Sequence, residues 1–155
     1  DYIINLQGDE PDIDVNDIRN LNNLILKNDS EIGTLAAKIK DKAIFSNSNV
    51  VKVITKNEII DNNFSLALDF TRKVNEDTKK NTYHHIGIYA YKTSILERIV
   101  NLNQSENEIK NQLEQLRAMD NGIKINVALA KSSPISIDTM EDYEKVKKKL
   151  LETKN

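Results

Sequence analysis

Short apolar runs alternate with segments of helical period along the whole chain, and this alternation narrows the folds available to it. Strands are predicted at residues 2–6, 32–39, 50–55, 64–70, 85–91 and 123–130. Helices are predicted to begin near residues 14, 93, 106 and 140, where apolar residues recur at helical spacing. Strands interleaved with helices are typical of an α/β layered domain. Because the strands at 64–70 and 85–91 could form an antiparallel pair, we expect a mixed sheet.

Three segments allow more detailed predictions. The first is a strand with one buried face, formed by Phe64, Leu66, Leu68 and Phe70. The second is a single helix from about residue 106 to a stop at Gly122, with inward residues Ile109, Leu113, Leu116 and Met119. The polar residues 72–83 between strands are predicted to form a long loop. Asp14 or Asn16 could cap the first helix, and Thr139 with Asp142 resembles a capping box.

Composition excludes several classes of protein. The 155 residues suit one domain with a real core, and 22 basic against 24 acidic residues give a net charge of −2. That charge excludes a strongly basic nucleic-acid binder and gives no reason to expect a membrane surface as partner. The lack of cysteine excludes disulfides and cysteine-based catalysis or zinc binding. No apolar run reaches the roughly 18 residues of a membrane span, so a cytoplasmic protein is expected.

Two aspartates are candidate metal ligands. Asp9 follows the first predicted strand, and Asp138 lies at another junction between an apolar run and a helix. Open α/β sheets bind ligands beyond the carboxyl ends of their strands. A hard divalent cation takes oxygen ligands and keeps several waters, so two carboxylates could hold it. The alternative is structural, with Asp9 as a turn residue and Asp138 as a helix cap.

Other polar residues are less specific. His85 begins a strand and could be a hydrogen-bonded structural residue, while Arg72 after a strand could hold an anion or cap that strand end. Glu114 and Arg117 are three residues apart, so a surface ion pair on a solvated helix is the simpler interpretation. There is no glycine-rich phosphate loop and no Gly-x-Ser-x-Gly motif. The residues themselves support only an α/β domain with a candidate acidic metal site, beside the structural alternative for both aspartates.

Five segments together resemble one enzyme family. Residues 5–11, Asn-Leu-Gln-Gly-Asp-Glu-Pro, resemble the Gln-Gly-Asp-Glu-Pro signature of the 3-deoxy-D-manno-octulosonate (Kdo) cytidylyltransferases. Residues 85–91 resemble the family's His-x-Gly-Ile-Tyr-x-Tyr strand, and residues 113–117 its Leu-Glu-Gln-Leu-Arg helix. Residues 127–130 and 137–142 are similar to its closing strand and Asp-Thr-x-Glu-Asp turn. The segments occur in the family's order and at about its spacing.

The resemblance implies a Rossmann-like nucleotidyltransferase domain, with a mixed, mostly parallel sheet and flanking helices. Residues 1–155 would form one partial domain that lacks the amino-terminal part, and about 60–84 would belong to a dimerisation subdomain. The family couples CTP and Kdo to give CMP-Kdo and pyrophosphate for lipopolysaccharide synthesis. The resemblance also implies a homodimer. Asp9 and Asp138 would bind the catalytic Mg²⁺. The Kdo site would comprise Gln7, Arg72, His85, Tyr89, Glu114 and Gln115, with Arg72 meeting the carboxylate.

Departures from the family leave alternatives open. The family's basic Pro-Ala-Arg nucleotide loop does not occur, and the chain opens at Asp1 directly on a strand, so a preceding segment is expected. The 155 residues alone are expected to be inactive and marginally stable, because residues 2–6 would lack a neighbouring strand. Residues 73–77 differ from the family's Ile-Pro segment. The parent enzyme could use a related 2-keto sugar acid such as 8-amino-Kdo, or the chain could be a non-catalytic sugar-binding or assembly piece.

Overall fold

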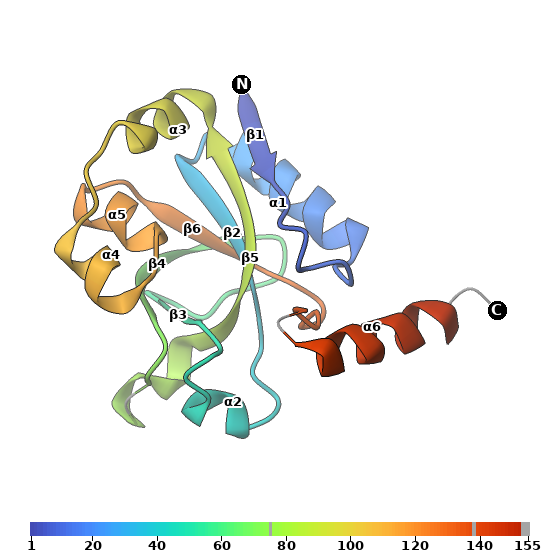
Figure 1. Ribbon diagram of the computed structural model, residues 1–155. Helices are drawn as coiled ribbons and strands as arrows, with labels where there is room; N and C mark the ends of the chain where they lie inside the picture. Colours follow the sequence, from blue (N-terminus) through green and yellow to red (C-terminus); the bar gives the residue numbers. More distant parts are fainter. Residues whose placement is uncertain (75, 138, 153–155) are drawn as a thin grey trace.

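The computed structural model describes residues 1–74, 76–137 and 139–152 and contains every predicted strand (Figure 1). The strands are β1 (Tyr2–Asn5), β2 (Ile32–Ala37), β3 (Lys52–Thr55), β4 (Phe64–Thr71), β5 (Thr82–Lys92) and β6 (Ile125–Leu129). The α-helices are α1 (Val15–Asn28), α2 (Ala43–Ser46), α3 (Thr93–Val100), α4 (Glu106–Asn111), α5 (Gln115–Asp120) and α6 (Met140–Glu152). A 3-10 helix, Glu76–Asn81, occupies part of the predicted loop at 72–83.

The strands form one mixed sheet in the order β1-β5-β2-β6-β4-β3. The prediction of a mixed sheet is confirmed, but the sheet is not mostly parallel, since β2 and β6 form the parallel pair and the other described pairings are antiparallel. Three of the antiparallel pairings involve β5, which is antiparallel to β1, β2 and β3. The predicted pairing of β4 with β5 is also wrong, because β3 lies between them and pairs with both.

The two edges of β5 are used differently, and this difference creates the site. Along one edge β5 pairs with β2. On the opposite edge, β3 pairs with residues 82–84 and β1 pairs with residues 89–92. Residues 86–88 therefore have no strand beside them on that edge. The segments that follow β1 and precede β3 converge on this gap.

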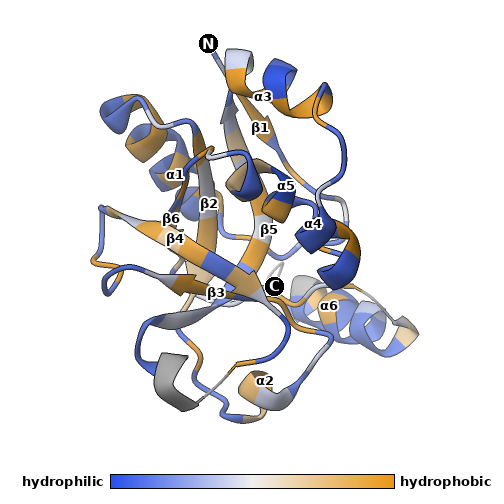
Figure 2. Cartoon of the chain, turned by 90° about the vertical axis from the view of Figure 1, so that its left-hand side faces the viewer, coloured by the Kyte–Doolittle hydropathy of each residue, from blue (hydrophilic) through white to orange (hydrophobic). Residues whose placement is uncertain are grey.

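Hydrophobic side chains cover both faces of the sheet. On one face, α1 packs Leu21, Leu24 and Ile25 against strand residues such as Leu35 and Ile86. On the other face, α3, α4 and α5 cover a second cluster, and Figure 1 shows these helices opposite α1. Apolar residues gather on the strands, whereas α4 and α6 carry much of the hydrophilic surface (Figure 2). No helix in the described ranges is long and apolar enough to span a membrane.

The predicted buried face of β4 is partly wrong. Ser65, Ala67 and Phe70 are buried, whereas Leu68 is 54% exposed. The cause is an irregularity in the β3–β4 pairing, in which Ile54 faces Asp69 but the next residue of β3 faces Ala67. The extra residue, Leu68, forms a bulge that shifts the alternation of side chains by one position.

The single helix predicted from residue 106 to residue 122 is two helices. Gln112 adopts a left-handed conformation with φ of 53°, which ends α4 before α5 begins. The break turns Ile109 outward, where it is 62% exposed, while Leu113 and Leu116 are buried as predicted. Ser105 and Glu108 form a capping box at the start of α4.

The predicted helix caps are confirmed, whereas the predicted burial of the first strand is wrong. Asp14 is the N-cap of α1, and its carboxylate accepts a hydrogen bond from the amide of Asn16 at 2.8 Å. The capping box of Thr139 and Asp142 is confirmed by reciprocal bonds of 3.1 and 3.2 Å. Strand β1 is half-buried rather than buried on both faces, and it lies at the end of the sheet beside β5. The predicted subdomain at 60–84 stays a prediction.

Candidate functional site

A cavity of about 810 Å³ lies at the gap beside β5, bounded by the segments after β1, before β3 and before α6. Its walls include Asp9 and all the predicted sugar-site residues, which are Gln7, Arg72, His85, Tyr89, Glu114 and Gln115. These residues come from four separate parts of the chain, and the fold brings them to one place. Asp138 lies outside the described residues, but Ser136 and Thr139 near it in the chain also line the cavity.

The loop after β1 contacts the segment that leads into α6. The amide of Ile137 donates a hydrogen bond to the carbonyl of Asp9 at 2.9 Å, and the Asp9 side chain is exposed. The carboxylate of Asp142 accepts bonds from the amide and hydroxyl of Thr139, so it serves the helix cap. Within the described ranges, no group of three or more His, Asp or Glu side chains could hold a metal by itself. Asp9 is therefore the predicted metal ligand whose position the structure gives.

Gly87 makes room for Gln7 in the gap. A methyl group added at Gly87 would lie 2.7 Å from Oε1 of Gln7 and 3.9 Å from Oε1 of Glu10. Any larger residue would push the Gln7 amide away from β5. Glu10 is buried and its Oε1 lies 3.5 Å from the Gly87 amide nitrogen, a contact that the sequence did not predict.

Two basic side chains hold the loop before β3 at the cavity wall. Arg72, directly after β4, donates through Nη1 to the carbonyl of Asn49 at 3.0 Å. Lys52 is fully buried, and its Nζ donates to the carbonyls of Asn47 at 2.5 Å and Arg72 at 2.8 Å. Burial and then the charge of Arg72 lower the pKa of Lys52. Of these two side chains Arg72 lines the cavity, so its guanidinium brings positive charge to the wall where an anionic ligand could bind.

An aromatic cluster forms another wall, in which His85 and Tyr89 of β5 line the cavity and Phe70 of β4 packs behind them. The rings of Phe70 and His85 are perpendicular at a centroid distance of 5.0 Å, and the Tyr89 ring centroid lies 5.4 Å from that of His85. Burial lowers the pKa of His85 to about 3, so its imidazole is neutral at neutral pH. The buried Tyr89 hydroxyl has no hydrogen-bonding partner among the described residues. A polar ligand group would satisfy it, and buried polar groups rarely lack a partner.

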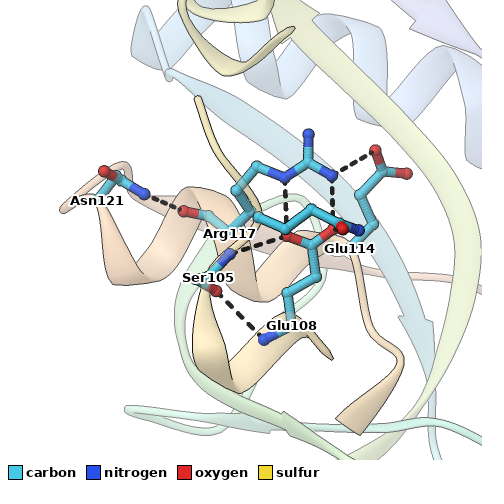
Figure 3. Close-up of polar contacts among 6 residues, drawn as sticks. Ser105, Glu108, Glu114, Arg117 and Asn121 are labelled. Atoms are coloured by element: carbon cyan, nitrogen blue, oxygen red, sulfur yellow. Dashed lines mark hydrogen bonds and ion pairs between the residues drawn. The ribbon is translucent and has the colours of Figure 1, made fainter. Parts of the chain in front are cut away.

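A buried ion pair supports the α4–α5 wall (Figure 3). Arg117 donates to Glu108 through Nε at 2.8 Å and through Nη2 at 2.5 Å, and the two side chains are only 14% and 6% exposed. The predicted surface pair with Glu114 is present at 3.5 Å, but it is secondary. The Glu114 side chain is 80% exposed and lines the cavity. Arg117 therefore connects Glu114 to a buried ion pair with Glu108, which the prediction of a surface pair did not include.

The acid stability of the chain should depend on this anchor. The hydrogen bonds from Arg117 lower the pKa of Glu108 from 4.5 to about 2. A carboxylate with a lowered pKa stabilises the fold above its unfolded-state pKa and loses that contribution as the pH falls through the folded-state value. We expect the difference in unfolding free energy between wild type and Glu108→Gln to shrink from pH 4.5 to pH 2. Urea titrations across this range measure it, and a difference independent of pH would contradict the assignment.

Comparison with known proteins agrees with this geometry. The family described as Cytidylyltransferase matches residues 1–125. The chain belongs to the cytidylyltransferase family. The 3-deoxy-manno-octulosonate cytidylyltransferase of Brucella anthropi is 37% identical over 147 residues, which are 95% of this chain and 59% of that protein. The enzyme of the same name from Brucella ovis is also 37% identical, over 58% of its length.

Solved structures show the same relation. A CMP:2-keto-3-deoxy-manno-octonic acid synthetase complexed with CTP superimposes with a TM-score of 0.85 at 31% identity, over 99% of this chain and 63% of that one. An apo UDP-glucose pyrophosphorylase superimposes with a TM-score of 0.62 at 15% identity, which shows a shared fold alone. The predicted nucleotidyltransferase fold and family are thus confirmed. This cytidylyltransferase chain spans about three-fifths of the curated relatives it matches.

Proposed function

We propose that this cytidylyltransferase chain carries the sugar-acid site of an enzyme that couples CTP and Kdo to give CMP-Kdo and pyrophosphate. The observation that carries the proposal is the convergence of Gln7, Arg72, His85, Tyr89, Glu114 and Gln115 on one cavity. The similarity to enzymes named for this reaction supports the same substrate.

The side chains suit a polyhydroxylated acid. Arg72 offers a planar fork that can bind a carboxylate in bidentate fashion. Gln7 and Gln115 provide both donors and acceptors, and Glu114 provides acceptors for sugar hydroxyls. The Tyr89 hydroxyl, which has no partner in the described structure, can donate to or accept from a further ligand oxygen.

The reaction requires positioning more than a protein nucleophile. The anomeric hydroxyl of Kdo attacks the α-phosphorus of CTP, a new oxygen–phosphorus bond forms, the bond to the pyrophosphate oxygen breaks, and the hydroxyl proton passes to solvent water. Arg72 would fix the sugar acid by its carboxylate, and the other site residues would set the orientation of its hydroxyls. Such orientation accounts for much of the rate in phosphoryl-type transfers.

We propose Asp9 and Asp138 as ligands of Mg²⁺. Asp9 is exposed at the cavity, and magnesium sites commonly use one or two carboxylates with substrate phosphates and waters. Bound there, the ion would neutralise phosphate charge and stabilise the leaving pyrophosphate.

The test is pyrophosphate release from CTP, measured on this chain joined to the part of the Brucella anthropi enzyme that it does not span. Kdo should give turnover in the presence of Mg²⁺. Faster turnover with 8-amino-Kdo than with Kdo would assign the related acid instead. No turnover with any 2-keto sugar acid would contradict the proposal. In the same preparation, sedimentation should show the homodimer that we propose for the cytoplasmic enzyme.

Replacing Gly87 by alanine should weaken sugar binding without unfolding the chain. The added methyl group meets the flexible end of Gln7, which can move aside, so the melting temperature should change little. Displacing one hydrogen-bonding amide should weaken Kdo binding about 10-fold. Calorimetry and thermal unfolding measure the two effects. The matched control is Gly8→Ala, whose added methyl meets no atom within 4 Å and should leave both unchanged. Equal Kdo affinities of Gly87→Ala and wild type would contradict the role of Gln7.

A further inference from the structure

Thr34 lies inside an irregularity of the central strand pair. Thr34 pairs with Tyr89, but the next residue of β2 pairs with Ile86, so β5 contains two extra residues at this point. The fully buried Thr34 hydroxyl fills the irregularity. Its Oγ1 lies 2.6 Å from the carbonyl oxygen of Ile88, 3.4 Å from that of Ile86 and 3.1 Å from Nε2 of His85.

Counting protons decides the direction of these bonds. A threonine hydroxyl has one proton, and a carbonyl oxygen can only accept. The short contact with Ile88 therefore uses the proton of Thr34, since two oxygens without a proton between them would repel each other at 2.6 Å. The bond between Oγ1 and Nε2 must then be donated by the imidazole of His85. A neutral imidazole with its proton on Nε2 has a bare lone pair on Nδ1.

We propose that Thr34 is a positioning residue of the sugar-acid site, because it holds His85 as the Nε2–H tautomer and leaves Nδ1 to accept a hydrogen bond from a substrate hydroxyl. This inference rests on the proposed function for the identity of the ligand. His85 lines the cavity, and its Nδ1 has no hydrogen-bonding partner in the described part of the chain. Phe70 and Tyr89 pack on the ring and limit its rotation.

The inference also sets a rule of specificity. An acceptor at Nδ1 favours a ligand that presents a hydroxyl proton there, and it disfavours a carboxylate or ketone oxygen at the same point. Burial lowers the pKa of His85 to about 3, which keeps the ring neutral, so Nδ1 does not become a donor at neutral pH.

Long-range ¹H–¹⁵N NMR spectra of the 155-residue chain test the tautomer without any ligand, because the two ring nitrogens differ in shift according to which one carries the proton. The chain has two histidines, and His84→Asn assigns the signals of His85. Wild type and Thr34→Ser should both show the Nε2–H pattern, and Thr34→Val, which keeps the shape but lacks the hydroxyl, should lose it. An Nδ1–H pattern in the wild type, or an unchanged pattern in Thr34→Val, would overturn the proposal.

Calorimetry with Kdo tests the consequence for binding. Thr34→Val should bind Kdo about 10-fold more weakly than wild type, and Thr34→Ser should stay within about 2-fold. If Thr34→Val does not fold, the NMR spectra of wild type and Thr34→Ser still decide, because loss of the Nε2–H pattern in Thr34→Ser also overturns the proposal. An Nε2–H pattern in a wild-type chain that binds no 2-keto sugar acid would refute the proposed function while leaving the tautomer assignment intact.

Discussion

Replacing Glu108 by alanine should lower the free energy of unfolding by about 3–5 kcal/mol, which is the usual cost of removing one partner of a buried ion pair. The variant leaves the guanidinium of Arg117 only 14% exposed and without its main acceptor. It also removes the capping box that starts α4. Urea denaturation followed by circular dichroism measures the change.

A matched control uses an ion pair on the surface. Glu141 pairs with Lys145 at 2.8 Å, but the glutamate side chain is 78% exposed. Glu141→Ala should therefore change the unfolding free energy by less than about 1 kcal/mol. If Glu108→Ala lowers the free energy of unfolding by no more than Glu141→Ala does, the buried pair does not anchor α4 and α5.

Replacing Asp9 by asparagine should reduce kcat for pyrophosphate release by about 1,000-fold in the joined protein, with little effect on folding. The substitution keeps the size of the side chain but removes the negative charge that a hard cation requires. A loss of this size corresponds to several kcal/mol of transition-state stabilisation, as expected for metal assistance. Steady-state kinetics at saturating CTP and Kdo measure it.

The control for Asp9 is Glu97→Gln, because Glu97 is an exposed acid on α3 and does not line the cavity. It should keep the wild-type kcat. A kcat for Asp9→Asn within about 5-fold of wild type would remove Asp9 from the proposed metal site, since metal ligands contribute far more.

The sequence predicted the elements better than their pairing. Apolar runs located the strands, but nothing local indicated that β3 inserts between β4 and β5, because strand order is fixed by contacts distant in the sequence. The bulge at Leu68 and the left-handed Gln112 are single-residue events that do not alter the hydrophobic pattern. The capping box of Ser105 and Glu108, by contrast, is visible in the sequence and agrees with the predicted start of a helix near residue 106.

In the candidate site, too, local motifs were predictable and contacts between distant parts of the chain were not. Residues in recognisable motifs, such as Gln7 and Glu114, were predicted and line one cavity. The supporting residues were missed, because Thr34 and Lys52 act through partners distant in the chain: Thr34 bonds to a histidine 51 residues away, and Lys52 to a carbonyl 20 residues away. A lysine within the β-branched run before residue 55 was the available signal, since lysine is rarely buried without a role.

The most direct test is a calorimetric titration of Kdo into the 155-residue chain and into Arg72→Ala. The wild-type chain should bind Kdo at one site, and loss of the guanidinium should weaken binding at least about 30-fold, because a charge-assisted pair with the carboxylate is removed. Arg72→Lys should fall between the two, since lysine keeps the charge but not the fork. Absence of Kdo binding to the wild-type chain, or equal affinity in Arg72→Ala, would contradict a sugar-acid site at this cavity.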